Sequence, residues 1–429
     1  MAHYSLFSRS FSKEELKNLR FGALFICFIL AFSFLTFLNQ PFFRPDSTQI
    51  VISSIHKFSN SRTDVLEITG DIRIAGNSST IFLSSTPQSP NITSINPYPR
   101  KEDNFIMKNY VTLWKINHHN ISEQNKLPKC HRRFDVPAVL FSSGGYTGNH
   151  FHDFTDTIIP LYLTARQFNR TVIFLITDKR TVWLQKYKLV LASLSNYDTI
   201  DIDKENRVLC FGRMIVGLRS HKELGIDPLQ PPHYSMIQFR RFLRTTYSLH
   251  RHSINIRTCN NRPRMLIISR KDNRFIINED EVADKARDLG FDVVVQEMGS
   301  TMLDTAKQVN LFDVMVGVHG AGLTNMLFLP ENGVIIQIIP FGADLWAKPY
   351  FGMTAKDMGL RYLEYGVSLN ESSLLGKYPV ESEVYRDPDA IFKKGFVEFH
   401  SVYLNNQDVN LDLDRLSVTF VKAFELVRC

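Results

Sequence analysis

The feature that most constrains the fold of this chain is an alternation of strand-like and helix-like segments between residues 264 and 339. Short apolar runs rich in Val and Ile predict buried strands, and helix signals separate them, such as the start at Asn278 and Glu281 and the stop at Gly290. Strands and helices that alternate at this spacing form a parallel, doubly wound sheet. The expected strands are 264–269, 292–296, 313–318 and 334–339, and the expected helices are 280–289 and 302–309.

The first half of the chain has a similar pattern. It predicts strands at 137–142, 171–177 and 208–218, and helices at 151–168, with a break near Pro160, and at 182–194. We therefore expect an α/β fold with two Rossmann-like lobes facing a cleft at the carboxyl ends of their strands. The expected parts are an N-terminal, acceptor-side lobe at 105–255, a C-terminal, ligand-binding lobe at 256–389, and helices packed on the body at 390–429.

An uncharged apolar stretch at residues 21–38 has close to the ~20 residues that cross a hydrocarbon core. Basic residues lie mainly on its N-terminal side, which predicts a cytosolic tail at 1–20 and a transmembrane signal-anchor at 21–38. A cleaved signal peptide is the alternative, but the stretch is long for one, and Asn39-Gln40-Pro41 follows it in place of small residues. The polar composition of Ser84–Pro99 favours a flexible stem over 39–104, with a short strand pair near 65–68 and 80–83.

Sequons and cysteines favour a secretory route for the rest of the chain. The N-x-[ST] sequons are at Asn77, Asn91, Asn120, Asn169 and Asn370, and the cysteines beyond the anchor are Cys130, Cys210, Cys259 and Cys429. These four cysteines allow three pairings, among which the sequence does not choose. The net charge of +7 suits a phosphate-bearing ligand, whereas the anchor and sequons argue against a nucleic-acid partner.

Two segments at the ends of expected strands favour a phosphate site. His319–Asn325 (HGAGLTN) follows one strand and opens a helix, so its glycines let backbone N–H groups approach an anion. Ser269–Arg274 follows another strand of the same sheet and offers guanidinium groups for a pyrophosphate clamp without a metal. The expected donor-binding residues are Arg270, Arg274, His319, Gly320, Ala321, Gly322, Leu323 and, for ribose hydroxyls, Glu297.

A third segment, Gly144–Asp156, has a glycine-rich turn followed by two histidines and two aspartates at the start of a helix. A group that takes the proton of an acceptor hydroxyl is expected here, and His152, Asp153 and Asp156 all remain candidates. Helix capping and core hydrogen bonding are the structural alternatives for these side chains. His150, His221 and Lys222 are also expected on the acceptor side.

No metal and no cofactor are expected. Asp201-Ile202-Asp203 has the D-x-D pattern of some metal sites, but Asp412-Leu413-Asp414 repeats that pattern, and no His or Cys ligand set accompanies either.

The chain resembles glycosyltransferase family 61, in its plant xylan-decorating branch, at five segments. They are GGYTGNHFHDFTDTIIPL (144–161), GLRSHKELGIDP (217–228), ISRKDNRFIINEDEV (268–282), VGVHGAGLTNMLFLPENGVIIQIIP (316–340) and AKDMGLRYLEY (355–365). The resemblance implies a single-pass type II protein of the Golgi membrane with a luminal body in the GT-B arrangement. It also implies inverting, metal-independent transfer from a uridine diphosphate sugar. At the position of Gln337, distant relatives often carry Glu. The neutral Gln337 of this chain cannot fill a role that needs a negative charge there.

The acceptor that the resemblance implies is xylan or its side chains, with xylose or arabinofuranose as the transferred pentose. Other relatives transfer xylose to N-glycans or N-acetylglucosamine to protein-linked sugars. The alternative expectation is therefore a xylosyl- or N-acetylglucosaminyltransferase that acts on N-glycans or protein O-glycans. A non-catalytic Golgi scaffold is the competing class, and a scaffold would not need to bind uridine diphosphate.

Overall fold

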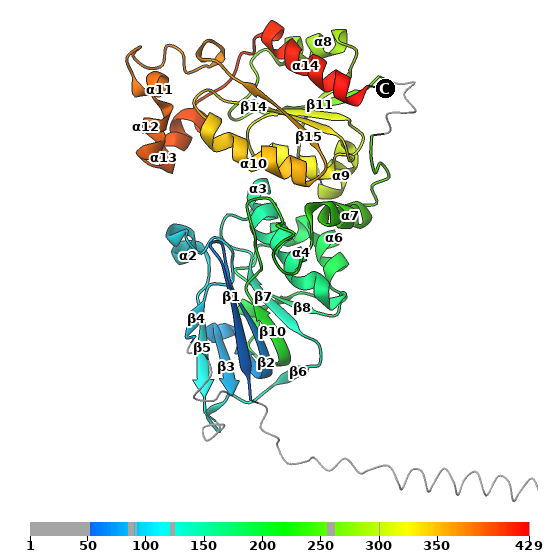
Figure 1. Cartoon of the computed structure of the whole chain (residues 1–429). Coiled ribbons are helices and arrows are strands. Elements are labelled where there is room, and N and C mark those ends of the chain that lie inside the picture. The colour runs from blue at the N-terminus through cyan, green and yellow to red at the C-terminus, as the bar shows by residue number, and fades with distance from the viewer. Residues whose placement is uncertain are drawn as a thin grey trace, which may run out of the picture. The chain divides into compact units, whose positions relative to one another are not determined.

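The structure, a computed structural model, describes residues 52–84, 90, 92–120, 125–254, 262–299 and 301–428. These residues fall in one structural unit and form two β-sheets with helices packed against them (Figure 1). The expected tail and signal-anchor at 1–38 lie outside the described residues, as do Asn91, Cys259 and Cys429. Within the described ranges, no helix has both the length and the apolar character needed to cross a bilayer.

The C-terminal sheet is parallel throughout, as the alternating pattern predicts. Its five strands lie in the order β12-β11-β13-β14-β15. The chain therefore reverses its direction of winding between β11 and β13, and such a switch point leaves a crevice for a ligand at the carboxyl ends of the strands. The strands are β11 (Arg264–Ser269), β12 (Asp292–Glu297), β13 (Val314–Val318), β14 (Val334–Ile339) and β15 (Arg361–Gly366), the last of which was not expected.

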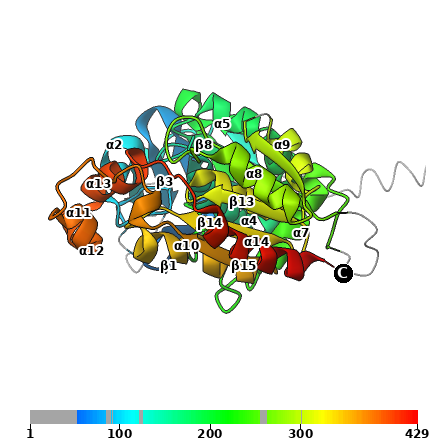
Figure 2. The same cartoon turned by 90° about the horizontal axis from the view of Figure 1, so that it is seen from above.

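Helices cover both faces of this sheet (Figures 1 and 2). Because side chains alternate along a strand, Met265 and Ile267 of β11 pack in the core under α8 and α14. Leu266 of the same strand packs on the opposite face with α9 and α10. The bounds are α8 (Glu279–Asp288), α9 (Met302–Val309), α10 (Asp344–Asp357) and α14 (Leu413–Val427).

Three short helices pack against α10 before the chain enters α14. Ala343 and Ala347, at the start of α10, share a buried cluster with Phe399 and Tyr403. These elements are α11 (Glu383–Arg386), α12 (Pro388–Lys393), α13 (Phe396–Phe399) and a π-helical turn, η8 (His400–Asn405). The tail expected at 390–429 thus forms helices, although α12 begins two residues before that boundary.

The N-terminal sheet differs from a Rossmann-like lobe because it is mixed. Its parallel part, β10-β7-β8-β9, has the expected α/β character, but β2 pairs with β10 in the antiparallel direction. The strands of the parallel part are β7 (Ala138–Ser142), β8 (Ile173–Thr177), β9 (Ile200–Asp201) and β10 (Leu209–Val216). The others are β1 (Ser54–Ser59), β2 (Asp64–Ala75), β3 (Thr80–Ser84), β4 (Ser94–Ile95), β5 (Trp114–His119) and β6 (Arg132–Phe134).

The expected flexible stem at 39–104 is wrong for residues 54–84 and 92–104, although the short strand pair expected near 65–68 and 80–83 corresponds to parts of β2 and β3. Strand β2 lies between β3 and β10, and its side chains Ile68, Ile72 and Ile74 are fully buried. Leu66 pairs with Val216, so a strand far along the sequence supplies the burial that the local composition lacks. The segment ends at Asp103, which caps helix α2 (Asn104–Tyr110) by accepting a hydrogen bond from the Ile106 N–H.

The helical segment after the glycine-rich turn contains a π-helical stretch. Helix α3 (His150–His152) continues into the π-helical η3 (Asp153–Ile158) and then into α4 (Ile159–Ala165), where Pro160 occupies the first turn. Such π-helical insertions are frequent at functional sites. The other helices of this part are η4 (Arg166–Phe168), α5 (Thr181–Lys186), α6 (Lys188–Leu194), η5 (Ile202–Lys204) and α7 (Met236–Tyr247).

One buried cluster joins the helices of the two sheets. It includes Phe154 and Leu161 from the first lobe together with Leu323 and Phe351 from the second. The two lobes therefore share one hydrophobic core.

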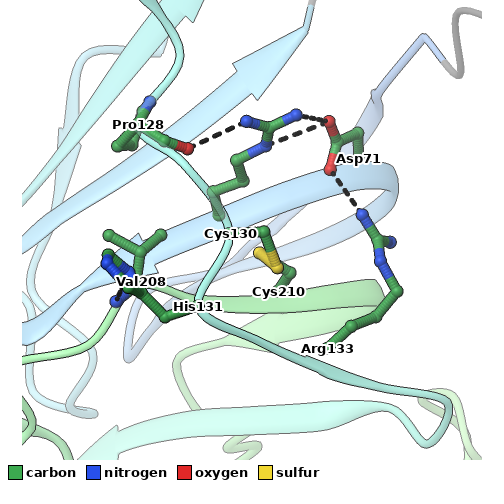
Figure 3. Close-up of a disulfide and its surroundings, with 8 residues drawn as sticks. Asp71, Pro128, Cys130, His131, Arg133, Val208 and Cys210 are labelled. Carbon is green, nitrogen blue, oxygen red and sulfur yellow. Dashed lines mark hydrogen bonds and ion pairs between the residues drawn. A yellow bond between two sulfur atoms is a disulfide. The ribbon is translucent and has the colours of Figure 1, made fainter. Parts of the chain in front are cut away.

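A disulfide joins Cys130, just before β6, to Cys210 in β10 (Figure 3). Arg73 lies beside it and donates to Asp71 and to the carbonyl of Pro128. The asparagines of the described sequons, Asn77, Asn120, Asn169 and Asn370, are all exposed.

Candidate active site

A cationic pocket of about 380 Å³ lies at the carboxyl ends of β11 and β12, next to the start of the 3-10 helix η6 (Ala321–Phe328). Its wall carries four cations, Lys186, Arg270, Lys271 and Arg274, and two carboxylates, Asp272 and Glu297. Gly322 and Asn325 of η6 also line the pocket, as does His150 from the first lobe. The pocket thus occupies the switch point of the parallel sheet and has a positive balance suited to an anion.

Arg270 and Arg274 converge on Gly320. An added side chain at Gly320 would place its Cβ 3.0 Å from Nη1 of Arg270 and 3.2 Å from Nη1 of Arg274. Gly320 also has φ +152°, a conformation that favours glycine. This position therefore needs a glycine both for its backbone and for the close approach of the two guanidinium groups.

The two guanidinium groups lack a direct counter-charge in the part of the chain that the structure describes. Their hydrogen bonds go to neutral oxygens, from Arg270 to Asn273 and from Arg274 to the His319 carbonyl at 2.9 Å. Burial, followed by the charge of Arg270, lowers the pKa of Arg274 to about 9. Burial also lowers the pKa of Arg270. A bound diphosphate would relieve both effects, since it pairs with guanidinium groups through charge-assisted hydrogen bonds.

His319 is buried and neutral. Burial, followed by the charges of Arg274 and Arg270, lowers the pKa of His319 to about 3. Its ring lies edge-on to Trp346 and Phe351, with centroids 4.9 and 5.5 Å away.

A chain of hydrogen bonds determines which nitrogen of His319 carries the proton. Nε2 of Gln337 lies 2.8 Å from Nδ1 of His319 and donates to the carbonyl of Ala347 at 3.1 Å, while Oε1 accepts from the Tyr362 hydroxyl. Because a carbonyl can only accept, the atom facing Ala347 is the amide nitrogen, and it donates to Nδ1 as well. The proton of the neutral imidazole therefore sits on Nε2, which is left as a donor.

His150 connects the two lobes at the pocket wall. Its Nε2 lies 3.0 Å from Oδ1 of Asn325, whose own Nδ2 donates to the Gly322 carbonyl. Burial, followed by the charge of Lys186, lowers the pKa of His150 to about 4, so this ring is neutral too. The sequence placed His150 on the acceptor side, whereas the structure places it in the cationic pocket beside Lys186.

Asp153 is completely buried and fully hydrogen-bonded. It accepts from the Gly148 N–H at 2.8 Å, and from Lys186 and the Tyr187 hydroxyl at 2.9 Å each. These hydrogen bonds connect the glycine-rich turn to the end of α5, so the Asp153 carboxylate has a structural role here.

Asp156 is also buried, and it orients His152. Its Oδ2 lies 2.8 Å from Nδ1 of His152 and accepts from Nε of Arg100 at 2.7 Å, while Oδ1 accepts from Arg62 at 3.2 Å. Burial alone would raise the pKa of Asp156, but Arg100 and the His152 hydrogen bond outweigh it, so the net shift is downward. An ionised Asp156 holds the proton of His152 on Nδ1 and leaves the Nε2 lone pair free.

Of the three candidate bases, His152 is the one that is partly exposed. Its Nε2 also has no hydrogen-bond partner among the residues that the structure describes. Its side chain is 21% exposed, against 0% for Asp153 and Asp156. The ring stacks on Tyr146, with centroids 4.4 Å apart.

Three further residues hold this pair, and the sequence analysis did not single out two of them, Arg62 and Arg100. Glu223 accepts from Arg62, Arg100 and the hydroxyl of Thr155, and it completes a network of two arginines and two carboxylates. Arg62 and Arg100 lie in the segment interpreted as a stem, and no local pattern marks either one.

Several expected site residues do not line the cationic pocket. Leu323 belongs to the core, and both ring nitrogens of His221 bond to backbone groups of Asp227 and Pro231. Lys222 borders a second cavity and pairs with Asp357 at 2.5 Å. Glu297 does border the cationic pocket, paired with Lys271 at 2.6 Å.

The D-x-D segment has a structural role. Asp203 accepts from the Thr177 hydroxyl and from the Asp178 N–H, both at 2.6 Å. Across the described ranges, no group of three or more His, Cys, Asp or Glu side chains is arranged to hold a metal ion. Metal independence stays a prediction.

The switch point of a parallel sheet is where such sheets bind ligands, and an imidazole oriented by a buried aspartate is an arrangement expected of an active site. The profile of the family described as Glycosyltransferase 61 matches residues 148–336. An alpha-1,3-arabinosyltransferase of Oryza sativa subsp. japonica is 41% identical over 86% of this chain and 64% of its own length. A beta-1,2-xylosyltransferase of the same plant is 38% identical over 86% of this chain and 84% of its own length.

A xylan glycosyltransferase of Arabidopsis thaliana is 38% identical over 85% of this chain and 77% of its own length. The chain belongs to glycosyltransferase family 61. It spans 64% of the length of the arabinosyltransferase that it matches.

Proposed function

We propose that this chain is an inverting glycosyltransferase that moves a pentose, xylose or arabinofuranose, from a uridine diphosphate sugar to xylan or its side chains. The observation that carries the proposal is the cationic pocket at the β11–β13 switch point, with two partly buried guanidinium groups that form no ion pair among the residues that the structure describes. The printed activities of the similar plant proteins support a pentose as the transferred group and xylan as the acceptor.

On the donor side, the diphosphate occupies the cationic pocket. Arg270 and Arg274 line the pocket and neutralise the charge that develops on the leaving uridine diphosphate. His319 lies behind the pocket wall, where its carbonyl accepts from Arg274, and its Nε2–H is the further donor in this proposal. The free backbone N–H groups at the start of η6 add the positive end of a short helix. These groups supply the role that a metal ion has in other transferases, so transfer proceeds without one.

On the acceptor side, His152 is the base. As an acceptor hydroxyl oxygen forms its bond to C1 of the donor sugar, Nε2 of His152 takes the hydroxyl proton and the bond from C1 to the diphosphate breaks. Asp156, 2.8 Å from Nδ1, stabilises the imidazolium that results. Attack from the face opposite the leaving group inverts the configuration at C1.

The cellular setting forms part of the same proposal. We place the two lobes in the GT-B arrangement, with residues 21–38 anchoring a single-pass type II protein in the Golgi membrane and the body in the lumen. The Cys130–Cys210 disulfide and the exposed sequon asparagines support an oxidising, secretory compartment.

A transfer assay tests the proposal. The purified chain is incubated with xylo-oligosaccharides and a panel of uridine diphosphate sugars, with and without chelator. We expect a product with one pentose donor, unaffected by chelator. The variant His152→Gln should lose at least about a hundredfold in kcat while binding uridine diphosphate normally, and Arg274→Ala should weaken that binding.

A matched control is His233→Gln, at an exposed histidine, which should transfer like the parent. A folded parent that neither binds uridine diphosphate nor makes any product would overturn the enzyme proposal and leave a scaffold. Transfer only to N-glycan or protein-glycan acceptors would overturn the xylan assignment alone.

A further inference from the structure

A second cavity, of about 630 Å³, lies beside α10 and has a different chemical character. Leu345, Pro349 and Met353 recur every fourth residue along α10 and border it, together with Trp346 and Tyr350. The opposite wall comes from α12 and its neighbours. This aromatic cavity is lined on that side by Asp389, Phe392, Lys393 and Phe399, and at one end by Lys222 and Glu223.

We propose that the aromatic cavity binds the sugar chain of the acceptor, with pyranose rings stacked on Trp346, Tyr350 and Phe392. The C–H face of a pyranose is apolar and flat, so it packs on aromatic rings, while its equatorial hydroxyls reach the charged side chains at the rim. This assignment rests on the proposed function, since it names the place where the acceptor of that reaction lies.

The charges around the cavity favour a neutral ligand. Lys222 and Lys393 are balanced by Glu223 and Asp389, whereas the cationic pocket has an excess of positive side chains. A polyanion would therefore be drawn to the cationic pocket and would gain little from the aromatic cavity. An uncharged, polyhydroxylated chain suits this cavity, because it can stack on the aromatic rings and form hydrogen bonds with both the cationic and the anionic side chains.

The wall of the cavity is connected by side-chain contacts to the groups proposed to carry out transfer. Glu223, in its wall, accepts from Arg100, which also bonds to Asp156 and so holds His152 in place. The ring of Tyr350, in the same wall, lies 5.6 Å from Phe151. It also lies 6.4 Å from His319, on the donor side. A sugar chain in this cavity would therefore contact residues that touch both the support of the base and the donor side.

The rim exposes apolar side chains that a ligand would cover. Leu345 is 74% exposed, Met353 63% and Phe392 45%. Three large apolar groups around one cavity form the kind of patch that marks a binding surface.

Calorimetric titration of the full chain with xylohexaose, and separately with uridine diphosphate, tests this site. We expect Phe392→Ala to weaken xylohexaose binding at least about fivefold and to leave uridine diphosphate affinity within about twofold of the parent. Met353→Glu, which places a charge among the rings, should abolish oligosaccharide binding with the same retention of nucleotide binding. The matched control is Phe105→Ala on α2, where the ring is 64% exposed and far from the cavity lining in sequence.

Retained uridine diphosphate affinity shows that a variant is folded. The site assignment is overturned if the parent does not bind xylohexaose, or if both cavity variants bind it as tightly as the parent. A parent that fails to bind uridine diphosphate contradicts the proposed function instead, and the oligosaccharide titrations still decide the cavity.

Discussion

The amide nitrogen of Gln337 lies 2.8 Å from Nδ1 of His319, and this contact leaves the imidazole proton on Nε2. A glutamate at this position would accept from Nδ1–H instead, which would raise the pKa of His319 and strip Nε2 of its proton in the neutral ring. We expect Gln337→Glu to lower uridine diphosphate affinity about tenfold near pH 8, because one donor to the diphosphate is lost.

The same variant should regain affinity as the pH falls, since a protonated His319 carries hydrogens on both nitrogens. Uridine diphosphate binding to the parent and to Gln337→Glu, measured from pH 5 to pH 8, separates the neutral from the protonated state of His319 in the variant. A variant whose affinity follows the pH dependence of the parent would show that the proton on Nε2 does not contribute to binding. Tyr362→Phe, which removes only the partner of the Gln337 Oε1, serves as the control.

Arg100 is expected to contribute strongly to stability. Replacing it by Gln leaves the buried Asp156 carboxylate with one guanidinium in place of two, and breaking a buried pair in this way costs about 3 kcal/mol. The free energy of unfolding in urea measures this cost.

The double variant Arg100→Gln with Asp156→Asn should lose less stability than the two single changes added together, because no unpaired charge is left in the core. Simple additivity of the two changes would contradict the coupling inferred here. The transfer rate should remain low in the double variant, since a neutral amide in place of the Asp156 carboxylate would not stabilise the His152 imidazolium.

Burial of His319 should make the fold sensitive to acid. Its pKa is about 3 in the folded state, whereas an unfolded histidine titrates near 6.5. Below pH 6.5 only the unfolded state takes up this proton, so stability falls until the pH approaches 3 and then levels off. The loss is about 1.4 kcal/mol per pH unit, or about 2 kcal/mol by pH 5.

Comparing the unfolding free energies of the parent and His319→Gln at pH 7 and pH 5 isolates this effect. The free energy of unfolding of His319→Gln should fall less between pH 7 and pH 5 than that of the parent. His233→Gln, at an exposed position, should behave like the parent. An equal pH dependence in all three proteins would show that His319 is protonated in the folded state.

The Cys130–Cys210 disulfide closes a loop with a sequence separation of 80. Loop closure of this size restricts the unfolded chain, and we expect Cys130→Ser to cost about 3 kcal/mol. The midpoint of urea unfolding should fall, and a reductant should no longer affect it. A parent whose midpoint is unchanged by reductant would indicate that the bridge adds no stability.

Four of the five strands of the C-terminal sheet were predictable because their signals are local, whereas β15 was not expected. The run VIIQII matches β14 at both ends, and the turn after β13 carries its glycines in the sequence itself. Strand ends then bring Arg274 and His319 together by a general rule of parallel sheets.

The N-terminal sheet was only partly predictable because its order depends on distant pairing. Strand β2 contains Gly70 and is followed by a polar segment, so composition suggested a stem, yet β10 and β3 pair with it along its two edges and its apolar side chains are buried. Arg62 and Arg100 were missed for the same reason. A charged side chain far along the sequence gives no sign that it will meet Asp156 in the core.

The place of β2 also governs the order in which this chain can fold during synthesis. Its partner β10 is made long after it, and at ~5–20 residues per second the delay is on the order of 10 s. For that time a strand of alternating apolar residues has β1 and β3 beside it but no partner on the β10 side. The nascent chain therefore exposes the unpaired edge of β2 until residue 216 has emerged. During this interval a chaperone would find that edge accessible.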